Sequence, residues 1–309
     1  MVIAVVIPYF KLNYFKNLLD ALSYQSNSNF KVYVGDDCSP DCPVKRIEEY
    51  KNKLNIVYKK FEKNIGHTSL TRHWERCVEL IEDEEWVWIL PDDDLPSKNC
   101  VEEFYKALPV VKEKNIRVFR FPLKRIDGHG KIINHGNEDN PEFENNFDFY
   151  TRILKGKTSS SLGDNIFSRK HLNESGGFVD FPKAWGSDHA TVLNVSSKGN
   201  IYYLDKAVFY FRMSGENISS DNSDGVIKLK SRILFAKWLK RNEHIFPSKP
   251  NQEFYQFFYW KGEYYVLNEW GFSLHMLVLL YQLRRICFRS RNILPIVKVV
   301  LKKCRIIQS

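Results

Sequence analysis

The chain has 309 residues, of which 43% are hydrophobic and 27% are charged, as in a folded protein with a large core and about two domains. The formal net charge is +9, and residues 270–309 hold eight basic side chains and no acidic one. The body of the chain is therefore nearly neutral. This excludes a protein that follows nucleic-acid phosphates with its whole surface, and no DNA- or RNA-reading motif is present.

The cysteines and the first residues indicate a cytoplasmic protein. None of the six cysteines forms a CxxC pair, and Cys38 and Cys42 have no second pair or His cluster that would complete a zinc site. The N-terminal apolar run ends at Pro8, without the basic region or cleavage site of a signal peptide. We therefore expect reduced thiols.

The first 121 residues alternate between strand and helix patterns, which predicts a parallel α/β sheet. Short apolar runs predict buried strands at 2–10, 30–35, 55–60, 86–90 and 116–121. Apolar residues at helical spacing predict helices at 13–26, from Pro43, at 69–82, and from Ser97, a candidate N-cap.

After Phe121 the regular alternation ends. We expect a hairpin turn at 126–134, a polar loop at 135–146, a short helix at 147–156, a strand within 159–169, a Gly-rich loop leading into a helix at 175–199, and two short strands at 201–213. A polar linker at 214–225 precedes helical sequence. The predicted parts are 1–95, 96–223 and 224–309.

Two of the predicted strands lead directly into carboxylates. Asp36 and Asp37 follow the second strand, and Asp92, Asp93 and Asp94 follow the fourth. Both sets should reach the same sheet edge, where a ligand would bridge them. Three adjacent acids repel one another unless a cation lies among them, and hard divalent cations prefer oxygen ligands. The alternative is a solvated acidic turn, since Asp and the flanking prolines favour turns.

The basic end of the chain allows two interpretations. Basic amphipathic helices with aromatic residues suit an anionic membrane surface, whereas a packed helical subdomain would present a solvated basic face. The apolar run at 273–283 is too short to span a bilayer, which takes about 20 residues. The one-sided charge favours the membrane surface.

Five motifs carry a resemblance to a known family: "VIPYFK", "VGDDCSPD", "NIGHTSLTRHWERC", "WILPDDDLPSKN" and "GGFVDFPKAWGSDHA". In this order and spacing they resemble family 2 glycosyltransferases with the GT-A fold, over residues 2–215. The resemblance implies a Rossmann-like nucleotide-binding sheet, an irregular α+β acceptor region and, outside it, a C-terminal helical extension. It also implies inverting transfer of a hexose from a nucleotide-sugar, most simply UDP-linked, to a glycan or lipid-linked acceptor. The setting it implies is bacterial cell-surface polysaccharide synthesis at the inner face of the membrane, assisted by Mn²⁺ or Mg²⁺.

The resemblance also assigns the donor contacts. They fall on Pro8, Tyr9, Phe10, Asp36, Asp37, Asn64, Gly66, Arg72, Asp92, Asp93 and Arg212. Phe10 or Tyr9 would stack on the base, and Asp37 would accept its N–H. Lys11 and His73 stand where the family commonly has Asn. Turn formation by the paired acids and a surface role for Arg72 remain alternatives.

Within the acid triplet, Pro91 occupies the family's first Asp position. The resemblance therefore places the metal on Asp94 and Asp93, with Asp92 nearer the ribose or phosphates.

The resemblance makes Asp188 the catalytic base, although Ser187 replaces the family's Glu. The alternative is that Ser187 or Asp188 caps the helix that follows. Trp185, Ser187 and His189 are the candidate acceptor contacts, against structural roles as a core Trp and a structural His.

A second class of function is a non-catalytic nucleotide-sugar-binding scaffold of a polysaccharide assembly complex. The retained carboxylates of Asp37, Asp93, Asp94 and Asp188 argue against it. A Rossmann oxidoreductase is disfavoured because no GxGxxG follows the first strand.

Overall fold

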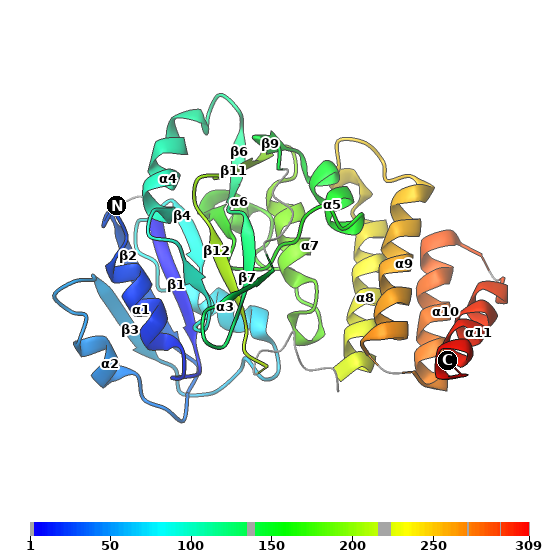
Figure 1. Cartoon of the computed structure of the whole chain (residues 1–309). Helices are drawn as coiled ribbons and strands as arrows, with labels where there is room; N and C mark the ends of the chain where they lie inside the picture. Colours follow the sequence, from blue (N-terminus) through cyan, green and yellow to red (C-terminus); the bar gives the residue numbers. More distant parts are fainter. Residues whose placement is uncertain (1–2, 135–139, 216–223, 271, 291, 309) are drawn as a thin grey trace.

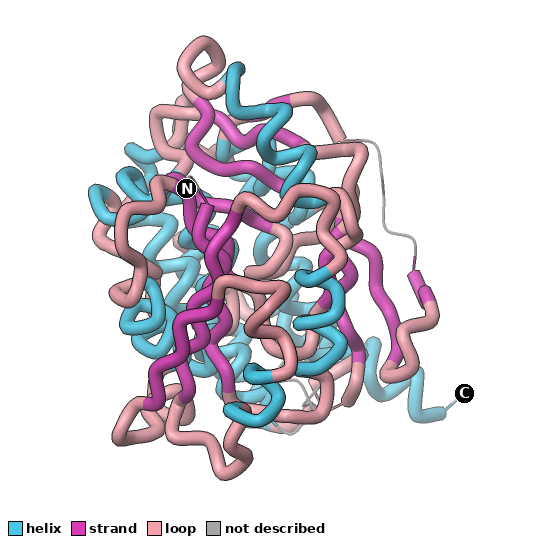
Figure 2. The backbone as a smooth tube through the Cα atoms, turned by 90° about the vertical axis from the view of Figure 1, so that its left-hand side faces the viewer, coloured by secondary structure: helices cyan, strands magenta, loops and turns pink. Residues whose placement is uncertain are grey.

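The computed structural model describes residues 3–134, 140–215, 224–270, 272–290 and 292–308, with side chains described as far as residue 301. An eight-stranded sheet crosses its N-terminal part in the order β3-β2-β1-β4-β10-β6-β11-β9 (Figure 1). The strands are β1 (Ile3–Tyr9), β2 (Phe30–Asp36), β3 (Ile56–Lys60), β4 (Trp86–Ile89), β6 (Ile116–Arg120), β9 (Phe143–Glu144), β10 (Asn165–Ser168) and β11 (Asn200–Tyr203). Turned by 90°, the molecule shows the strands twisted about one another (Figure 2).

The five strands of the first 121 residues run in one direction, as predicted, and a later strand lies antiparallel between two of them. β1 to β4 are parallel neighbours, as expected, but β10 lies antiparallel to both β4 and β6. An apolar run predicts a strand without giving its direction, so the sequence pattern carried no signal for this reversal. The short strand β9 also falls within the segment predicted as a polar loop, of which 135–139 lie outside the described residues.

Successive side chains of β1 enter two separate hydrophobic layers, because side chains alternate across a strand. Ile3, Val5 and Ile7 face α1 (Phe15–Ser23), α2 (Val44–Glu48) and α4 (Cys100–Ala107). Val6 faces the layer that holds α3 (Leu70–Val78), α5 (Asn146–Leu154), α6 (Arg169–Glu174) and α7 (Ser187–Val195). The sheet is thus buried on both faces, which explains the unbroken apolar runs of its first strands.

The start of α4 differs from the prediction. Asn99, not Ser97, occupies the N-cap, and Ser97 donates to Asn99 Oδ1 at 2.8 Å. The helix begins after β5 (Leu95–Pro96), and Pro96 pairs with Phe209. This strand pairing keeps the chain extended beyond the acid triplet, so the helix starts later than its local sequence suggests.

A second, four-stranded sheet stands beside the first in the order β5-β12-β7-β8. Its remaining strands are β7 (Leu123–Asp127), β8 (Ile132–Asn134) and β12 (Phe209–Met213). β7 and β8 form the predicted hairpin, and β12 runs parallel to β7. This sheet connects the acid triplet to the strand that carries Arg212.

Four longer helices follow the predicted linker, of which 216–223 lie outside the described residues. They lie side by side at one end of the molecule (Figure 1) and are α8 (Gly225–Arg241), α9 (Gln252–Asn268), α10 (Leu274–Phe288) and α11 (Leu294–Gln308). Phe235, Phe258 and Leu280 are fully or almost fully buried in the layer that also holds α5 and α7. These helices therefore share the core of the sheet. None of the described helices is long and apolar enough to cross a membrane.

Candidate active site

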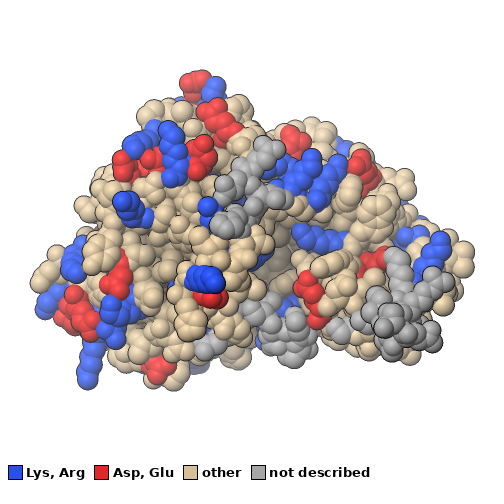
Figure 3. All heavy atoms as spheres, in the orientation of Figure 1, with Lys and Arg blue, Asp and Glu red and all other residues tan. Residues whose placement is uncertain are grey.

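A cavity of about 650 Å³ opens beside the carboxyl edge of the large sheet. Figure 3 shows the molecule hollowed near the middle of this face, with Lys and Arg side chains around the hollow. One wall comes from the ends of β1, β2 and β4, and the rest of the lining comes from α3, α5, β7, β12, α7, α8, α9 and the loops between them. Residues far apart in sequence therefore meet in one space.

Asp37 organises the first wall. Its carboxylate accepts the amide hydrogens of Ile65 at 2.9 Å and Gly66 at 2.8 Å, and it forms an ion pair with Arg76. A Cβ on Gly66 would lie 2.5 Å from Asp37 Oδ2, so this approach requires glycine. The loop that contains Asn64 is thus fixed against the end of β2, and Asn64, Gly66 and Asp37 all line the cavity.

Arg76, which the sequence reasoning missed, supports the site from outside the cavity lining by its contact with Asp37. Its guanidinium lies 3.9 Å from the centre of the Phe61 ring while it pairs with Asp37. Arg72, the residue predicted from α3, is exposed and lies outside the cavity lining. The available signal was helical spacing, because Arg76 shares the face of His73 and Cys77 that packs toward β2.

Several other predicted donor contacts support the wall from outside the lining. Asp36 accepts the amide of Ser39 at 2.7 Å and the hydroxyl of Tyr58 at 2.7 Å, which is the turn-supporting arrangement offered as its alternative. Tyr9 is buried and donates to the Asp41 carbonyl at 2.8 Å. The predicted residues outside the lining are Tyr9, Asp36, Arg72, Ser187 and Arg212.

The acid triplet is tied to the end of β1. Asp92 Oδ2 accepts the amide hydrogens of both Phe10 and Lys11 at 2.8 Å. Burial raises the pKa of Asp92 to about 6, and the neighbouring charge of Asp93 raises it too, against the lowering effect of the two amides. Pro8, Phe10 and all three acids line the cavity.

One carboxylate oxygen of Asp94 accepts no hydrogen bond from the described residues. Oδ1 accepts the Arg212 amide at 2.7 Å, whereas the buried Oδ2 has no hydrogen-bond partner among the described residues. Burial, and then the charge of Asp93, raise the pKa of Asp94 well above its usual range. Such an oxygen beside a second carboxylate suits a hard cation. In the described ranges no three His, Cys, Asp or Glu side chains group as metal ligands.

Arg212 binds the acid triplet from outside the cavity lining. Its Nε donates to the Asp93 carbonyl at 2.7 Å, and Nη1 donates to the carbonyls of Asp127 at 3.1 Å and Gly128 at 3.2 Å. The guanidinium lies 4.4 Å from the centre of the Tyr14 ring, and the side chain is almost fully buried. These contacts give Arg212 a positioning role for the loop on which the carboxylates stand.

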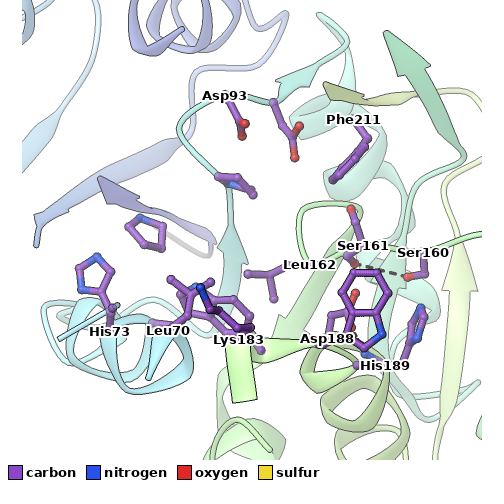
Figure 4. A pocket seen from close by; sticks show the side chains of 18 of the residues that line it. Leu70, His73, Asp93, Ser160, Ser161, Leu162, Lys183, Asp188, His189 and Phe211 are labelled. Atoms are coloured by element: carbon purple, nitrogen blue, oxygen red, sulfur yellow. Dashed lines mark hydrogen bonds between the residues drawn. The ribbon is translucent and has the colours of Figure 1, made fainter. Parts of the chain in front are cut away.

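Asp188 lies across the cavity from the acid triplet, in the first turn of α7. Figure 4 shows Asp93 on one side and Asp188, His189 and Ser161 on the other. Asp188 Oδ1 accepts the His189 amide at 2.8 Å, and Oδ2 has no hydrogen bond among the described residues. The alternative that Ser187 or Asp188 caps α7 is wrong: Gly186 occupies the N-cap position, and Ser187 is buried with Oγ accepting the Phe181 amide at 3.0 Å.

Trp185 and His189, the other candidate acceptor contacts, both line the cavity. The Trp185 ring packs edge-on against Trp270, with Lys228 Nζ 4.4 Å from its centre. His189 Nε2 is buried without a partner among the described residues, and burial lowers the pKa of His189. The aromatic ring of Trp185 and the imidazole of His189 therefore line the same cavity as Asp188.

The segment before Asp188 has an unusual backbone. Lys183, Ala184 and Gly186 have φ values of 57°, 51° and 88°, in the left-handed region that disfavours side chains. A Cβ on Gly186 would also lie 2.9 Å from the Phe235 ring. The surrounding packing therefore fixes α7, and with it Asp188, at a definite position on the cavity wall.

We expect Gly186→Ala to lower the free energy of unfolding by about 2–3 kcal/mol, from left-handed strain and from contact with Phe235. Gly176→Ala is a matched control, because Gly176 has φ of 87° and nothing within 4 Å of its Cβ position. The control should lose only about 1–2 kcal/mol. Urea unfolding measures both variants, and equal losses would show that the Phe235 contact relaxes at no cost.

The comparisons with known proteins define the class of this chain. The model of Glycosyl transferase family 2 matches residues 4–155, which include β1 to β4 and the acid triplet. The chain belongs to this family, as its motifs predicted.

Among curated proteins, the chain is similar to poly(ribitol-phosphate) beta-N-acetylglucosaminyltransferase TarS of Staphylococcus aureus, from two strains. The two sequences are 30% identical over 229 residues, which cover 71% of this chain and 37% of TarS. The alignment thus spans little more than a third of the length of that relative.

Solved structures confirm the predicted GT-A fold. Residues 1–349 of TarS, crystallised with UDP-GlcNAc, match with a TM-score of 0.68 at 19% identity, covering 93% of this chain and 82% of that one. A mannosyltransferase from Pyrobaculum calidifontis, in complex with GDP-Man and Mn²⁺, matches with a TM-score of 0.57 at 14% identity, covering 99% and 80%. The structure of GalNAc-T7 with UDP, GalNAc and Mn²⁺ matches with a TM-score of 0.55 at 12% identity. The match covers 85% of this chain and 54% of that one.

Proposed function

We propose that the protein is an inverting glycosyltransferase that moves a hexose from a UDP-linked sugar to a hydroxyl group of a glycan or lipid-linked acceptor. The observation that carries this proposal is the single cavity with Asp37 and the acid triplet on one wall and Asp188 on the opposite wall (Figure 4). Family membership and the UDP-GlcNAc complex of the similar TarS structure support the donor class.

In this proposal the first wall binds the nucleotide. The Phe10 ring, which is 37% exposed, stacks on the base, while Asp37 uses a lone pair not taken by the Ile65 and Gly66 amides to accept the base N–H. Asp92 holds Phe10 in place through its backbone amide. Donor binding then belongs to residues 1–95, and the acceptor lies against residues 96–223 and the helices from 224 onward.

A divalent cation, Mn²⁺ or Mg²⁺, would be held by Asp94 Oδ2 and Asp93. When bound, it neutralises charge on the leaving nucleoside diphosphate. Two structures of similar fold were solved with Mn²⁺. Asp188 takes the proton from the acceptor hydroxyl as that oxygen attacks the anomeric carbon from the side opposite the leaving group, which inverts the configuration.

A thermal-unfolding panel of nucleotide-sugars, with and without Mn²⁺, tests the proposed donor class. A ligand that binds only the folded state raises the unfolding temperature by mass action. We expect UDP-sugars to raise it more than GDP-sugars, and Mn²⁺ to increase the difference. If no nucleotide raises the unfolding temperature in either condition, the donor assignment is wrong, and transfer or donor hydrolysis by the purified protein separates an enzyme from a scaffold.

We further propose that the acceptor belongs to a bacterial cell-surface polysaccharide made at the inner face of the membrane. The name of TarS, an enzyme of poly(ribitol-phosphate), supports this class of acceptor. The last helices support contact with a membrane surface: Leu294, Val297 and Leu301 form one exposed apolar face of α11, and Arg285 and Lys298 are exposed nearby. Basic side chains beside an apolar face suit anionic lipids.

We expect Leu294→Gln combined with Leu301→Gln to weaken binding to anionic vesicles by tenfold or more, since burying each leucine contributes about 1.5–3 kcal/mol. Deletion of the tail would be a poor test, because Met276 and Leu283 of α10 are buried in the core. Tyr24→Gln, which changes an exposed side chain directly after α1, is the control. Vesicle co-sedimentation gives the affinities, and unchanged binding by the double variant would refute the membrane surface.

A further inference from the structure

Three cationic side chains line the cavity from three different elements: Arg125 on β7, Arg232 on α8 and Lys261 on α9. We refer to them as the cationic cluster. Arg232 donates to the Phe258 carbonyl, and Lys261 Nζ donates to the Ile153 carbonyl at 2.9 Å. These partners are neutral backbone groups, so the charges themselves are not compensated there.

No member of the cationic cluster forms an ion pair with Asp or Glu within the part of the chain that the structure describes. Lys183, another cation of the same lining, does so, with Asp224 at 3.1 Å. Burying a charge without a counter-charge is unfavourable, and folded proteins rarely retain such groups without a function. The missing anion is therefore expected from a ligand.

Lys261 interacts with the charges of both arginines. Burial, and then the charges of Arg232 and Arg125, lower the pKa of Lys261 to about 8, against a smaller raising effect of Glu269, which forms no ion pair with it. Burial also lowers the pKa of Arg232. Three cationic side chains in the lining of one partly enclosed space favour the binding of an anion.

The cationic cluster lies on the Asp188 side of the cavity. The charge of Lys261 contributes to the lowered pKa of His189, the residue after Asp188. Arg232 and Asp188 act in opposite directions on the pKa of Tyr150, so both lie near that ring. The opposite wall, by contrast, carries the carboxylates of Asp37 and the acid triplet.

We propose that the cationic cluster binds an anionic group of the acceptor, a phosphate or a carboxylate, close to the hydroxyl that reacts. The proposal rests on the function proposed above and narrows its acceptor to an acidic glycan or a phosphate-containing polymer. Arg125 and Arg232 offer planar forks that match both anions, and Lys261 adds a point charge. The diphosphate of the donor is assigned to the other wall, where its charge meets the acid triplet and its cation.

Calorimetric titration at saturating UDP tests this assignment with simple probes. Glycerol phosphate and glucuronate represent the two sources of an anion, and glycerol and glucose are their neutral counterparts. We expect at least one anionic probe to bind when UDP is present, and the neutral probes not to bind. Arg125→Gln and Lys261→Gln should each weaken that binding about tenfold, the loss typical of one charge-assisted hydrogen bond. Lys170→Gln, which removes one exposed charge on α6, should leave it unchanged.

Three outcomes overturn the proposal: no anionic probe binds, UDP displaces the probe, or neither cluster variant weakens binding. Displacement by UDP would mean that these cations serve the donor diphosphate. Arg125 is half-buried, and its side chain makes no hydrogen bond to any of the described residues. Its variant should therefore fold even if Lys261→Gln does not, and circular dichroism checks both. UDP binding and sugar transfer are measured separately, so failure of the proposed function leaves the anion titration interpretable.

Discussion

Asp188→Asn should reduce the turnover number about 10³-fold while the affinity for UDP stays the same, because a general base contributes roughly 10²–10⁴ to the rate. The substitution keeps the size of the side chain and an oxygen that can accept the His189 amide, as Oδ1 does at 2.8 Å. What it removes is the ability of Oδ2, which has no hydrogen bond among the described residues, to take a proton. The effect should therefore appear in the turnover number rather than in donor binding.

Transfer assays at saturating UDP-sugar and acceptor measure the turnover number, and calorimetry measures UDP affinity. Asp205→Asn is the matched control, since Asp205 is exposed and outside the cavity lining. Retention of more than a tenth of the turnover by Asp188→Asn would rule out Asp188 as the base. A parallel loss of UDP affinity would instead indicate that the variant disturbs the strained segment before α7.

Asp94→Asn should abolish the effect of Mn²⁺ on UDP affinity and lower turnover by about 10²–10³-fold, the usual effect of removing one group that stabilises developing charge. An asparagine oxygen can still accept the Arg212 amide, as Oδ1 does at 2.7 Å. Only the negative charge on the unpartnered Oδ2 is lost. Because an unpaired buried charge is itself unfavourable, its removal should change the free energy of unfolding by no more than about 1 kcal/mol in either direction.

Calorimetric titration of UDP with and without Mn²⁺ measures this effect, and urea unfolding checks stability. Asp92→Asn is the matched control within the same triplet: its side-chain oxygen can still accept the Phe10 and Lys11 amides, so the response to Mn²⁺ should persist. If Asp94→Asn responds to Mn²⁺ as the unmodified protein does, Asp94 is not a metal ligand.

Short-range patterns predicted the donor wall well. The buried runs that end at Asp36 and at Leu90 are local signals, and the parallel neighbours β2, β1 and β4 bring both acid sets to one edge, as expected. The role of Asp36 within its own turn was also an available alternative. Amphipathic spacing predicted the helices. The N-cap of α4 is Asn99 instead of the predicted Ser97, because strand pairing keeps the preceding residues extended.

The opposite wall was much less predictable. Arg232 and Lys261 lie in helical sequence whose periodicity indicates burial but does not identify the neighbouring element. The sequence therefore placed the helices from 224 onward outside the site, whereas α8 and α9 line the cavity. The contact of Arg76 with Asp37 was not predicted for a related reason. It depends on how α3 is rotated against β2, and only tertiary packing fixes that rotation.

The contact between Asp92 and the end of β1 has a consequence for the motions of the site. One carboxylate oxygen accepts two successive amides, so Phe10 and Lys11 can exchange their hydrogens with solvent only when the triplet swings away from the strand. Both amides lie at the rim of an open cavity, where fast exchange would otherwise be the rule. Their protection in a deuterium-exchange experiment would report directly how often the donor wall opens.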